Sequence, residues 1–132
     1  MTVEKLAAIL GKELDTWTRV EEGEVLFHFN GLEFNAMLLD AGIVRIFSVI
    51  DDEDIPETVR DEDILRMLNG IEKDVPCSKC VLLNRDENGV RYRLCIEFRY
   101  DEKAPELNVR GYCEIMMKMM MKFALGLYRL AS

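Results

Sequence analysis

An Asn-Gly pair between two alternating apolar segments is the feature that most constrains the fold of this chain. Apolar residues occupy every second position on both sides of the pair: Val25, Phe27 and Phe29 before it, and Leu32, Phe34, Ala36 and Leu38 after it. A two-residue Asn-Gly loop is the favoured connection of a tight β-hairpin. With Asn30-Gly31 as this loop, the apolar residues share one face and pair as Phe29 with Leu32, Phe27 with Phe34, and Val25 with Ala36.

A second turn extends this hairpin into a meander. The segment Asp40-Ala41-Gly42 suits a three-residue loop with its glycine in the left-handed conformation. The apolar face then continues to Ile50, and the register pairs Leu38 with Val44 and Ala36 with Ile46. The sequence therefore predicts a three-stranded antiparallel meander, preceded by a short strand at residues 17–20. His28 falls on the opposite face, where we interpret this single histidine as structural.

A second hairpin is predicted for residues 78–100. Its second half again alternates apolar and polar residues, with Val90, Tyr92, Leu94, Ile96, Phe98 and Tyr100 on one face. With Asn88-Gly89 as the turn, the register pairs Leu83 with Leu94 and Val81 with Ile96. The other face carries Arg91, Arg93, Glu97 and Arg99, and no exposed aromatic residue interleaves there to stack on nucleic-acid bases. We expect a solvated, partly paired face, and a five- or six-stranded antiparallel sheet packed against helices.

Two helices are predicted around the meander. Helical spacing of Leu6, Ile9, Leu10 and Leu14 predicts a helix from Val3 to Leu14, with Thr2 as its N-cap. A second helix is predicted near residues 58–73, with Ile64, Leu65, Leu68 and Ile71 on its buried face. Residues 51–63 hold eight carboxylates whose spacing does not match a calcium loop. We interpret this segment as a solvated loop that enters a helix N-terminus, where acidic groups favour the macrodipole.

The C-terminal helix is expected to start after Pro105 and to run to about Leu130. One apolar seam, typical of a helix lying on a sheet, comprises Tyr112, Met116, Met119, Phe123, Leu127 and Leu130. A second seam lies about 100° around the helix and comprises Met117, Met121, Ala124 and Tyr128. Three interpretations of the second seam stay open: core covered by the first helix, a dimer interface, or a groove for a client peptide. Methionine is common at surfaces that accept varied partners.

Composition bounds the class of protein. The chain has 132 residues, of which 49% are apolar and 32% charged, and its net charge is −8. These values predict a single soluble domain over residues 1–132 and exclude a disordered chain or a membrane protein. The negative charge argues against nucleic acid and anionic lipid as partners. The N-terminus has no secretory signal pattern, so a cytoplasmic location is expected.

Four cysteines are interpreted as ordinary reduced thiols: Cys77, Cys80, Cys95 and Cys113. Cys77 and Cys80 have the CxxC spacing of a zinc or redox site, but no second ligand pair accompanies them. In the predicted register Cys95 faces Leu82 and lies diagonal to Cys80, which leaves a thiol-based enzyme or metal protein as a third hypothesis. A nucleophilic pair would require Cys80 or Cys95 to meet His28 across the sheet.

The order helix, three-stranded meander, helix, hairpin and long amphipathic helix resembles the type III secretion chaperone-like fold. Within that fold the chain resembles the YbjN-like family of bacterial proteins. The resemblance rests on residues 63–73, on the strand at 79–83 followed by Asp86-Glu87-Asn88-Gly89, and on the apolar terminal helix. It implies an α+β fold and a binding or regulatory protein, with no catalytic residue, cofactor or metal to transfer. True secretion chaperones are homodimers that wrap an unfolded stretch of a secreted protein.

The leading functional hypothesis is a non-enzymatic interaction or regulatory domain that forms a homodimer through the C-terminal helix. Met117, Met121, Ala124 and Tyr128 are its candidate partner-binding residues. The alternative is a dedicated chaperone, in which the same helix and the exposed strand faces hold an extended client segment. In either case the partner is a second copy of the chain or another protein.

Overall fold

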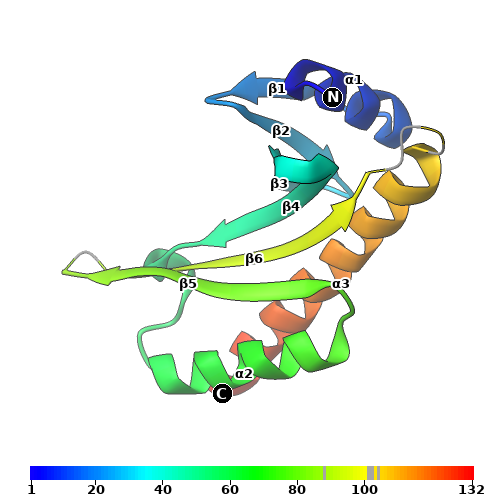
Figure 1. The fold of residues 1–132 in the computed structure, drawn as a ribbon. Coiled ribbons are helices and arrows are strands. Elements are labelled where there is room, and N and C mark those ends of the chain that lie inside the picture. The colour runs from blue at the N-terminus through cyan, green and yellow to red at the C-terminus, as the bar shows by residue number, and fades with distance from the viewer. Residues whose placement is uncertain (88, 101–102, 104) are drawn as a thin grey trace.

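The structure is a computed structural model that describes residues 1–87, 89–100, 103 and 105–132 (Figure 1). The long elements are α1 (Val3–Leu14), β1 (Thr18–Glu21), β2 (Glu24–Phe29), β3 (Leu32–Leu39), β4 (Ile43–Ile50), α2 (Asp61–Asp74), β5 (Ser78–Asp86), β6 (Gly89–Arg99) and α3 (Pro105–Ala131). Short 3-10 turns occupy Asp40–Gly42 and Asp52–Asp54. The strands form one antiparallel sheet in the order β1-β2-β3-β4-β6-β5, which confirms the predicted α+β class.

The meander follows its predicted register. Asn30 and Gly31 both take positive φ, at 50° and 82°, and join β2 to β3 with Phe27 opposite Phe34. Gly42 has a φ of 73° at the next turn, and Ala36 lies opposite Ile46. Turn chemistry and apolar alternation thus specify the same pairing, which is why the register could be predicted.

The second hairpin departs from its predicted register. Val81 lies opposite Arg93 rather than Ile96, and Cys80 lies opposite Leu94. A β-bulge between Leu82 and Asn84 leaves Leu83 without a partner, and Asp86 pairs with Gly89. The predicted Asn88-Gly89 turn is wrong, because Gly89 is the first residue of β6 and pairs with Asp86, while Asn88 lies outside the described residues. Because a bulge adds one residue to a single strand, alternation alone cannot place β5 against β6.

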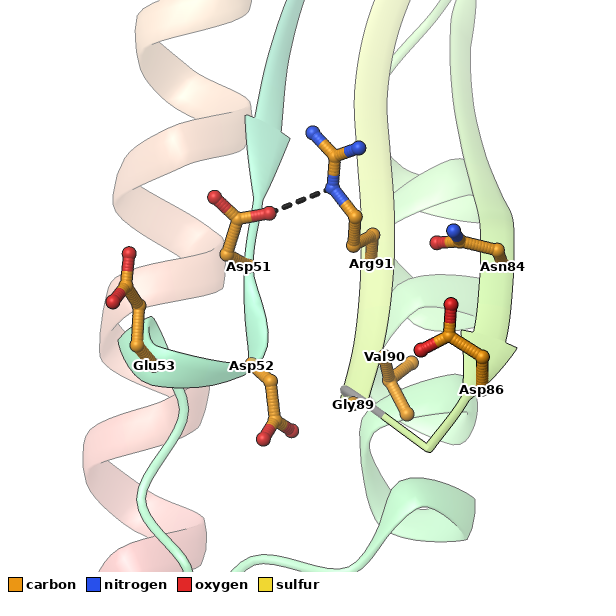
Figure 2. A pocket seen from close by; sticks show the side chains of 8 residues that line it. All are labelled: Asp51, Asp52, Glu53, Asn84, Asp86, Gly89, Val90 and Arg91. Carbon is orange, nitrogen blue, oxygen red and sulfur yellow. Dashed lines mark hydrogen bonds and ion pairs between the residues drawn. The ribbon is translucent and has the colours of Figure 1, made fainter.

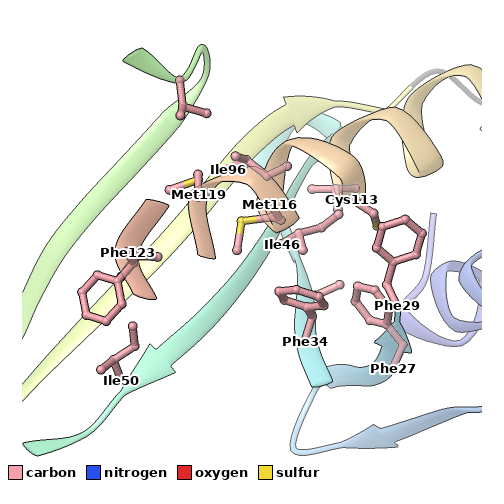
Figure 3. Packing of buried hydrophobic residues seen from close by; sticks show 14 of the residues in the cluster. Phe27, Phe29, Phe34, Ile46, Ile50, Ile96, Cys113, Met116, Met119 and Phe123 are labelled. Atoms are coloured by element: carbon pink, nitrogen blue, oxygen red, sulfur yellow. The ribbon is translucent and has the colours of Figure 1, made fainter. Parts of the chain in front are cut away.

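All three helices lie on one face of the sheet, which is the face with the alternating apolar residues (Figure 1). Phe27, Phe34 and Ile96 of the sheet pack there with Met116, Met119 and Phe123 of α3 (Figure 3). Within the described part of the chain, no helix lies over the opposite face, which we call the open face. Burial on one face explains the strict period of two in the strands.

The helices agree with the sequence in most respects. Thr2 caps α1 by accepting a hydrogen bond of 3.2 Å from the Lys5 backbone N–H. The second helix begins at Asp61 rather than residue 58, because a turn closes from the Val59 N–H to the Pro56 carbonyl. Leu65, predicted to be buried, is 36% exposed. Among the described residues, no helix is both long enough and apolar enough to cross a membrane.

A glycine at the start of β6 generates the first prediction. Gly89 has a φ of 120°, and a Cβ placed there would lie 2.7 Å from Cβ of Asp52. Gly89→Ala should lower the free energy of unfolding by about 1–3 kcal/mol, because it combines backbone strain with a contact to backbone-proximal atoms. Urea unfolding followed by circular dichroism measures this loss.

The matched control is Gly70→Ala in α2, where the added Cβ meets nothing within 4 Å. This substitution should raise the free energy of unfolding by about 0.5–1 kcal/mol, because alanine has the higher helix propensity. If both substitutions changed the free energy of unfolding in the same direction, the proposed role of Gly89 would be contradicted.

Candidate functional site

The predicted partner-binding residues lie on the outer side of α3. Met121 is 66% exposed and Tyr128 is 73% exposed, while Ala124 is also exposed and Met117 is half-buried. We call Met117, Met121, Ala124 and Tyr128 the α3 stripe. The interpretation of this seam as core beneath the first helix is therefore wrong. Leu125, at 49% exposed, widens the same apolar surface although sequence analysis did not include it.

The other predicted seam of α3 faces the sheet. Met116 and Met119 are fully buried, and Phe123 is nearly so. Tyr112 stacks on Phe98 of β6 with ring centroids 4.0 Å apart. Leu130 is the exception, because it is 37% exposed beyond the end of this packing. The sheet thus fixes the rotation of α3 and, with it, the outward direction of the α3 stripe.

Helix α2 packs beside α3 and leaves Met121, Ala124 and Tyr128 of the α3 stripe exposed, while Met117 partly packs against the core. A Cβ at Gly126 would overlap the Met67 thioether, so α2 side chains approach α3 closely at this glycine. The Lys122 ammonium group lies 3.8 Å from the Asp74 carboxylate across the two helices. Lys118 and Arg129 are eleven residues, or about three helical turns, apart and are exposed along the same side of the helix. The apolar stripe therefore has a basic margin in a chain that is acidic as a whole.

The open face of the sheet carries a second group of notable residues. Phe47 is only 6% exposed and Cys95 is fully buried, although neither belongs to the core under the helices. Beside them, Arg45 Nη2 donates to Glu97 Oε1 at 2.7 Å, and Lys79 Nζ donates to Glu97 Oε2 at 2.9 Å. The hydrogen bonds from Lys79 and Arg45 lower the pKa of the Glu97 carboxyl below its ordinary value. Sequence analysis did not identify this network, although the alternation in β6 places Glu97 on the same face.

The thiol-based hypothesis loses its predicted geometry. Cys95 lies opposite Lys79 rather than Leu82, so its side chain is on the open face while that of Cys80 is on the helix face. Burial raises the pKa of Cys80 to about 12 and raises that of Cys95 as well. His28 is on β2, three strands from β6, which corresponds to roughly 14 Å between strand axes. His28 instead stacks on Trp17 at 4.6 Å and lies 3.5 Å from the Glu33 carboxylate.

An acidic hollow of about 430 Å³ lies where the segment after β4 meets the second hairpin (Figure 2). Asp51, Asp52, Glu53 and Asp86 line it, and Asp51 Oδ1 accepts a hydrogen bond of 2.7 Å from Arg91 Nε. The Asp51 side chain also takes part in a capping box with Asp54. Within the described residues, no group of three histidine, cysteine, aspartate or glutamate side chains has the arrangement of a metal site.

Comparison with known proteins shows the fold. No protein-family profile and no curated protein sequence matches the chain. Among solved structures, it is similar to YbjN from E. coli, a proposed transcription regulator, with a TM-score of 0.67 and 15% sequence identity. The similarity covers 98% of this chain and 95% of the YbjN chain. This result confirms the YbjN-like fold, while the likeness to secretion chaperones stays a prediction.

The cysteine environments predict thiol reactivity. Cys77 is exposed, whereas Cys95 and Cys113 are buried and Cys80 is partly buried with a pKa of about 12. At pH 8 such a thiol is ionised in about one molecule in ten thousand, and only the thiolate attacks a disulfide reagent. Ellman's reagent should therefore label one thiol per native chain rapidly and all four after unfolding. Cys77→Ser should remove the fast phase, and a second fast thiol would contradict the assigned environments.

The Glu97 network predicts a pH-dependent contribution to stability. A depressed pKa in the folded state means that the carboxylate stabilises the fold above its unfolded pKa, near 4, and loses this effect as the pH falls through the folded value. Glu97→Gln should lower the free energy of unfolding by about 1–3 kcal/mol at pH 7 and by less at pH 4 and below.

Urea titrations at pH 7, 5 and 4 measure this difference. Glu33→Gln is the control, since Glu33 is also on the open face but 53% exposed beside His28. Its effect should stay within about 0.5 kcal/mol at each pH. If Glu97→Gln lowered the free energy of unfolding by the same amount at every pH, the contribution of the ionised Glu97 network would be contradicted.

Proposed function

We propose that this protein is a non-enzymatic protein-interaction domain that forms a homodimer through the α3 stripe. The observation that carries the proposal is the exposure of Met121 and Tyr128, at 66% and 73%, on a helix whose opposite side is fully packed. Contiguous exposed apolar side chains with a polar margin are typical of protein interfaces. Burial of one such side chain contributes about 1.5–3 kcal/mol.

The spacing of the α3 stripe fits a helical partner. Its residues follow one another at intervals of four, three and four, which is the seam spacing of paired helices. In a two-fold symmetric pair the same patch meets itself. An antiparallel arrangement centred between Met121 and Ala124 brings Met117 near Tyr128 of the second copy. Small Ala124 at the centre allows the two helices to approach closely.

Charge opposes this association and makes it depend on salt. Each copy carries a net charge of −8. Beside the stripe are two exposed cations, Lys118 and Arg129, which approach each other in the antiparallel pair, and one exposed carboxylate, Glu114. Like charges repel, and salt screens this repulsion. The proposed dimer should therefore strengthen as ionic strength rises, unlike an interface held by ion pairs.

Several features support binding rather than catalysis. Cys80 and Cys113 have pKa values of about 12, which disfavours their thiolates at neutral pH. His28 is held between Trp17 and Glu33, on a strand that does not adjoin the cysteine-bearing strands. A regulatory role, of the kind named for YbjN, is compatible with a domain that acts by binding.

The proposal predicts the oligomeric state and the residues that determine it. Light scattering over a hundredfold range of concentration should give a mass near 31 kDa for the dimer, twice the chain mass of 15.3 kDa. Met121→Lys with Tyr128→Lys should raise the protein concentration at which half of the dimer dissociates at least tenfold. Each copy would then bury two ammonium groups in the interface, and burial of unpaired charges is costly.

Leu32→Lys is the matched control, since Leu32 is 40% exposed at the hairpin turn, away from α3. It should leave the dissociation midpoint unchanged. A monomeric wild-type protein would contradict the dimer, and uptake of a hydrophobic dye by that monomer would favour the client-binding alternative. If Met121→Lys with Tyr128→Lys left the dissociation midpoint unchanged, the dimer interface would not be the α3 stripe.

A further inference from the structure

We propose that the open face of β4, β6 and β5 docks an extended, acidic segment of another protein. The proposal concerns a different surface from the α3 stripe, on the opposite side of the sheet. Three observations carry it: an excess of basic side chains, two arginines that lack a carboxylate partner among the described residues, and apolar side chains on both sides of Arg93.

Basic side chains concentrate on this face although the chain is acidic overall. Five of the 17 lysines and arginines are on the open face of three strands: Arg45, Lys79, Arg91, Arg93 and Arg99. On the same strands and face, the described carboxylates are Glu97 and Asp86. The rest of the chain must therefore carry the acidic excess, so this face attracts an anionic partner that other surfaces repel.

The basic residues divide into paired and unpaired groups. Glu97 accepts hydrogen bonds from Arg45 and Lys79, and Asp51 accepts one from Arg91. In contrast, Arg93 and Arg99 have no carboxylate partner among the described residues. Burial raises the pKa of the Cys95 thiol, and the nearby Arg93 guanidinium partly opposes this rise. Arg93 Nε is nevertheless buried with no hydrogen-bond acceptor among the described residues. This Nε is out of reach of a docked segment, but Arg93 as a whole is half-buried, so a partner carboxylate would pair with its Nη groups.

The surface around Arg93 is apolar. Val49 of β4 and Val81 of β5 are its neighbours across the sheet, one on each side. Phe47 and Cys95 lie next along the same strands and are buried without a covering helix. Apolar neighbours limit the access of water to Arg93, which strengthens its attraction to a carboxylate. An extended segment directs every second side chain to the same side, so carboxylates at alternate positions can all face the sheet.

The distance between the two unpaired arginines sets the length of the partner segment. Arg93 and Arg99 are six residues apart on β6, or roughly 20 Å at about 3.4 Å per residue. A hollow of about 370 Å³ lies at the Arg99 end, lined by Ile43, Cys77 and Lys79 among others. An extended segment of about seven residues would reach from Arg93 to this hollow.

A polypeptide fits the face better than a nucleic acid. Phe47, the aromatic residue near Arg93 on this face, is only 6% exposed and offers little ring surface to stack on bases, and Trp17 is at the far edge near β1. The net charge of −8 repels a long polyanion, whereas a short acidic segment meets mainly the local basic surface.

Fluorescence anisotropy with a fluorescein-labelled peptide of five Glu-Val repeats tests the proposal. Binding should saturate at one site per chain and weaken when salt rises from 50 to 300 mM. Arg93→Glu with Arg99→Glu should reduce the affinity at least tenfold. Exposed Arg99→Glu alone, which should not disturb folding, should reduce it about threefold.

The matched control is Arg19→Glu with Arg66→Glu, which makes the same change in net charge at exposed sites on β1 and α2. An equal loss of affinity in this control would overturn the proposal in favour of general electrostatics. Absence of saturable binding, or tighter binding of single-stranded DNA of equal charge, would also overturn it.

A third variant separates this proposal from the proposed dimer. Met121→Lys with Tyr128→Lys should leave peptide affinity unchanged, because the α3 stripe is on the other side of the sheet. If Arg93→Glu with Arg99→Glu instead abolished self-association, the open face would hold a second copy and the proposed acidic partner would be wrong. If the protein were monomeric but still bound the peptide, the dimer proposal would be wrong and the docking proposal would be supported.

Discussion

The pairing of β4 with β6 is the interaction on which the rest of the structure depends. Eight residue pairs, from Ile43 with Arg99 to Ile50 with Tyr92, join two hairpin systems that are far apart in the sequence. Ile46 and Ile96 meet near the middle of this ladder, and both are fully buried. Only the joined sheet is wide enough to receive α1, α2 and one side of α3 together. The central pairing therefore creates the core and both candidate surfaces at once.

Because all three helices lie on one face of the sheet, α3 has one side packed against the strands and one side turned away from them. The inner side of α3 packs on β4 and β6, and α2 packs beside it, so the outer side of α3 projects away from the sheet. The open face lies on the reverse side of the same strands. The α3 stripe and the open face are thus separate surfaces that the sheet and the inner side of α3 divide from each other.

The sequence determined the meander more closely than the second hairpin, and the difference has a physical cause. Asn30 and Gly31 both supply the positive φ that the turn requires, so the turn and the alternation agree. In β5 the apolar pattern is weak, and the bulge near Leu83 changes which residues face β6. The α3 stripe could be predicted because α3 has more apolar residues than one packing face needs. Exposure of Leu65 and Leu125 could not, since it depends on the angle between neighbouring helices.

The open face shows what alternation can and cannot reveal. Its charged residues could be assigned from the period of two, and sequence analysis placed Arg91, Arg93, Glu97 and Arg99 together. Pairing decides their chemistry, however, because Arg45 and Lys79 reach Glu97 from neighbouring strands and satisfy its carboxylate. Arg93 and Arg99 lie on either side of this network, and among the described residues neither pairs with a carboxylate. An acidic chain that holds its one central carboxylate in internal ion pairs presents a positive surface there, so the local field at this face has the opposite sign to the net charge.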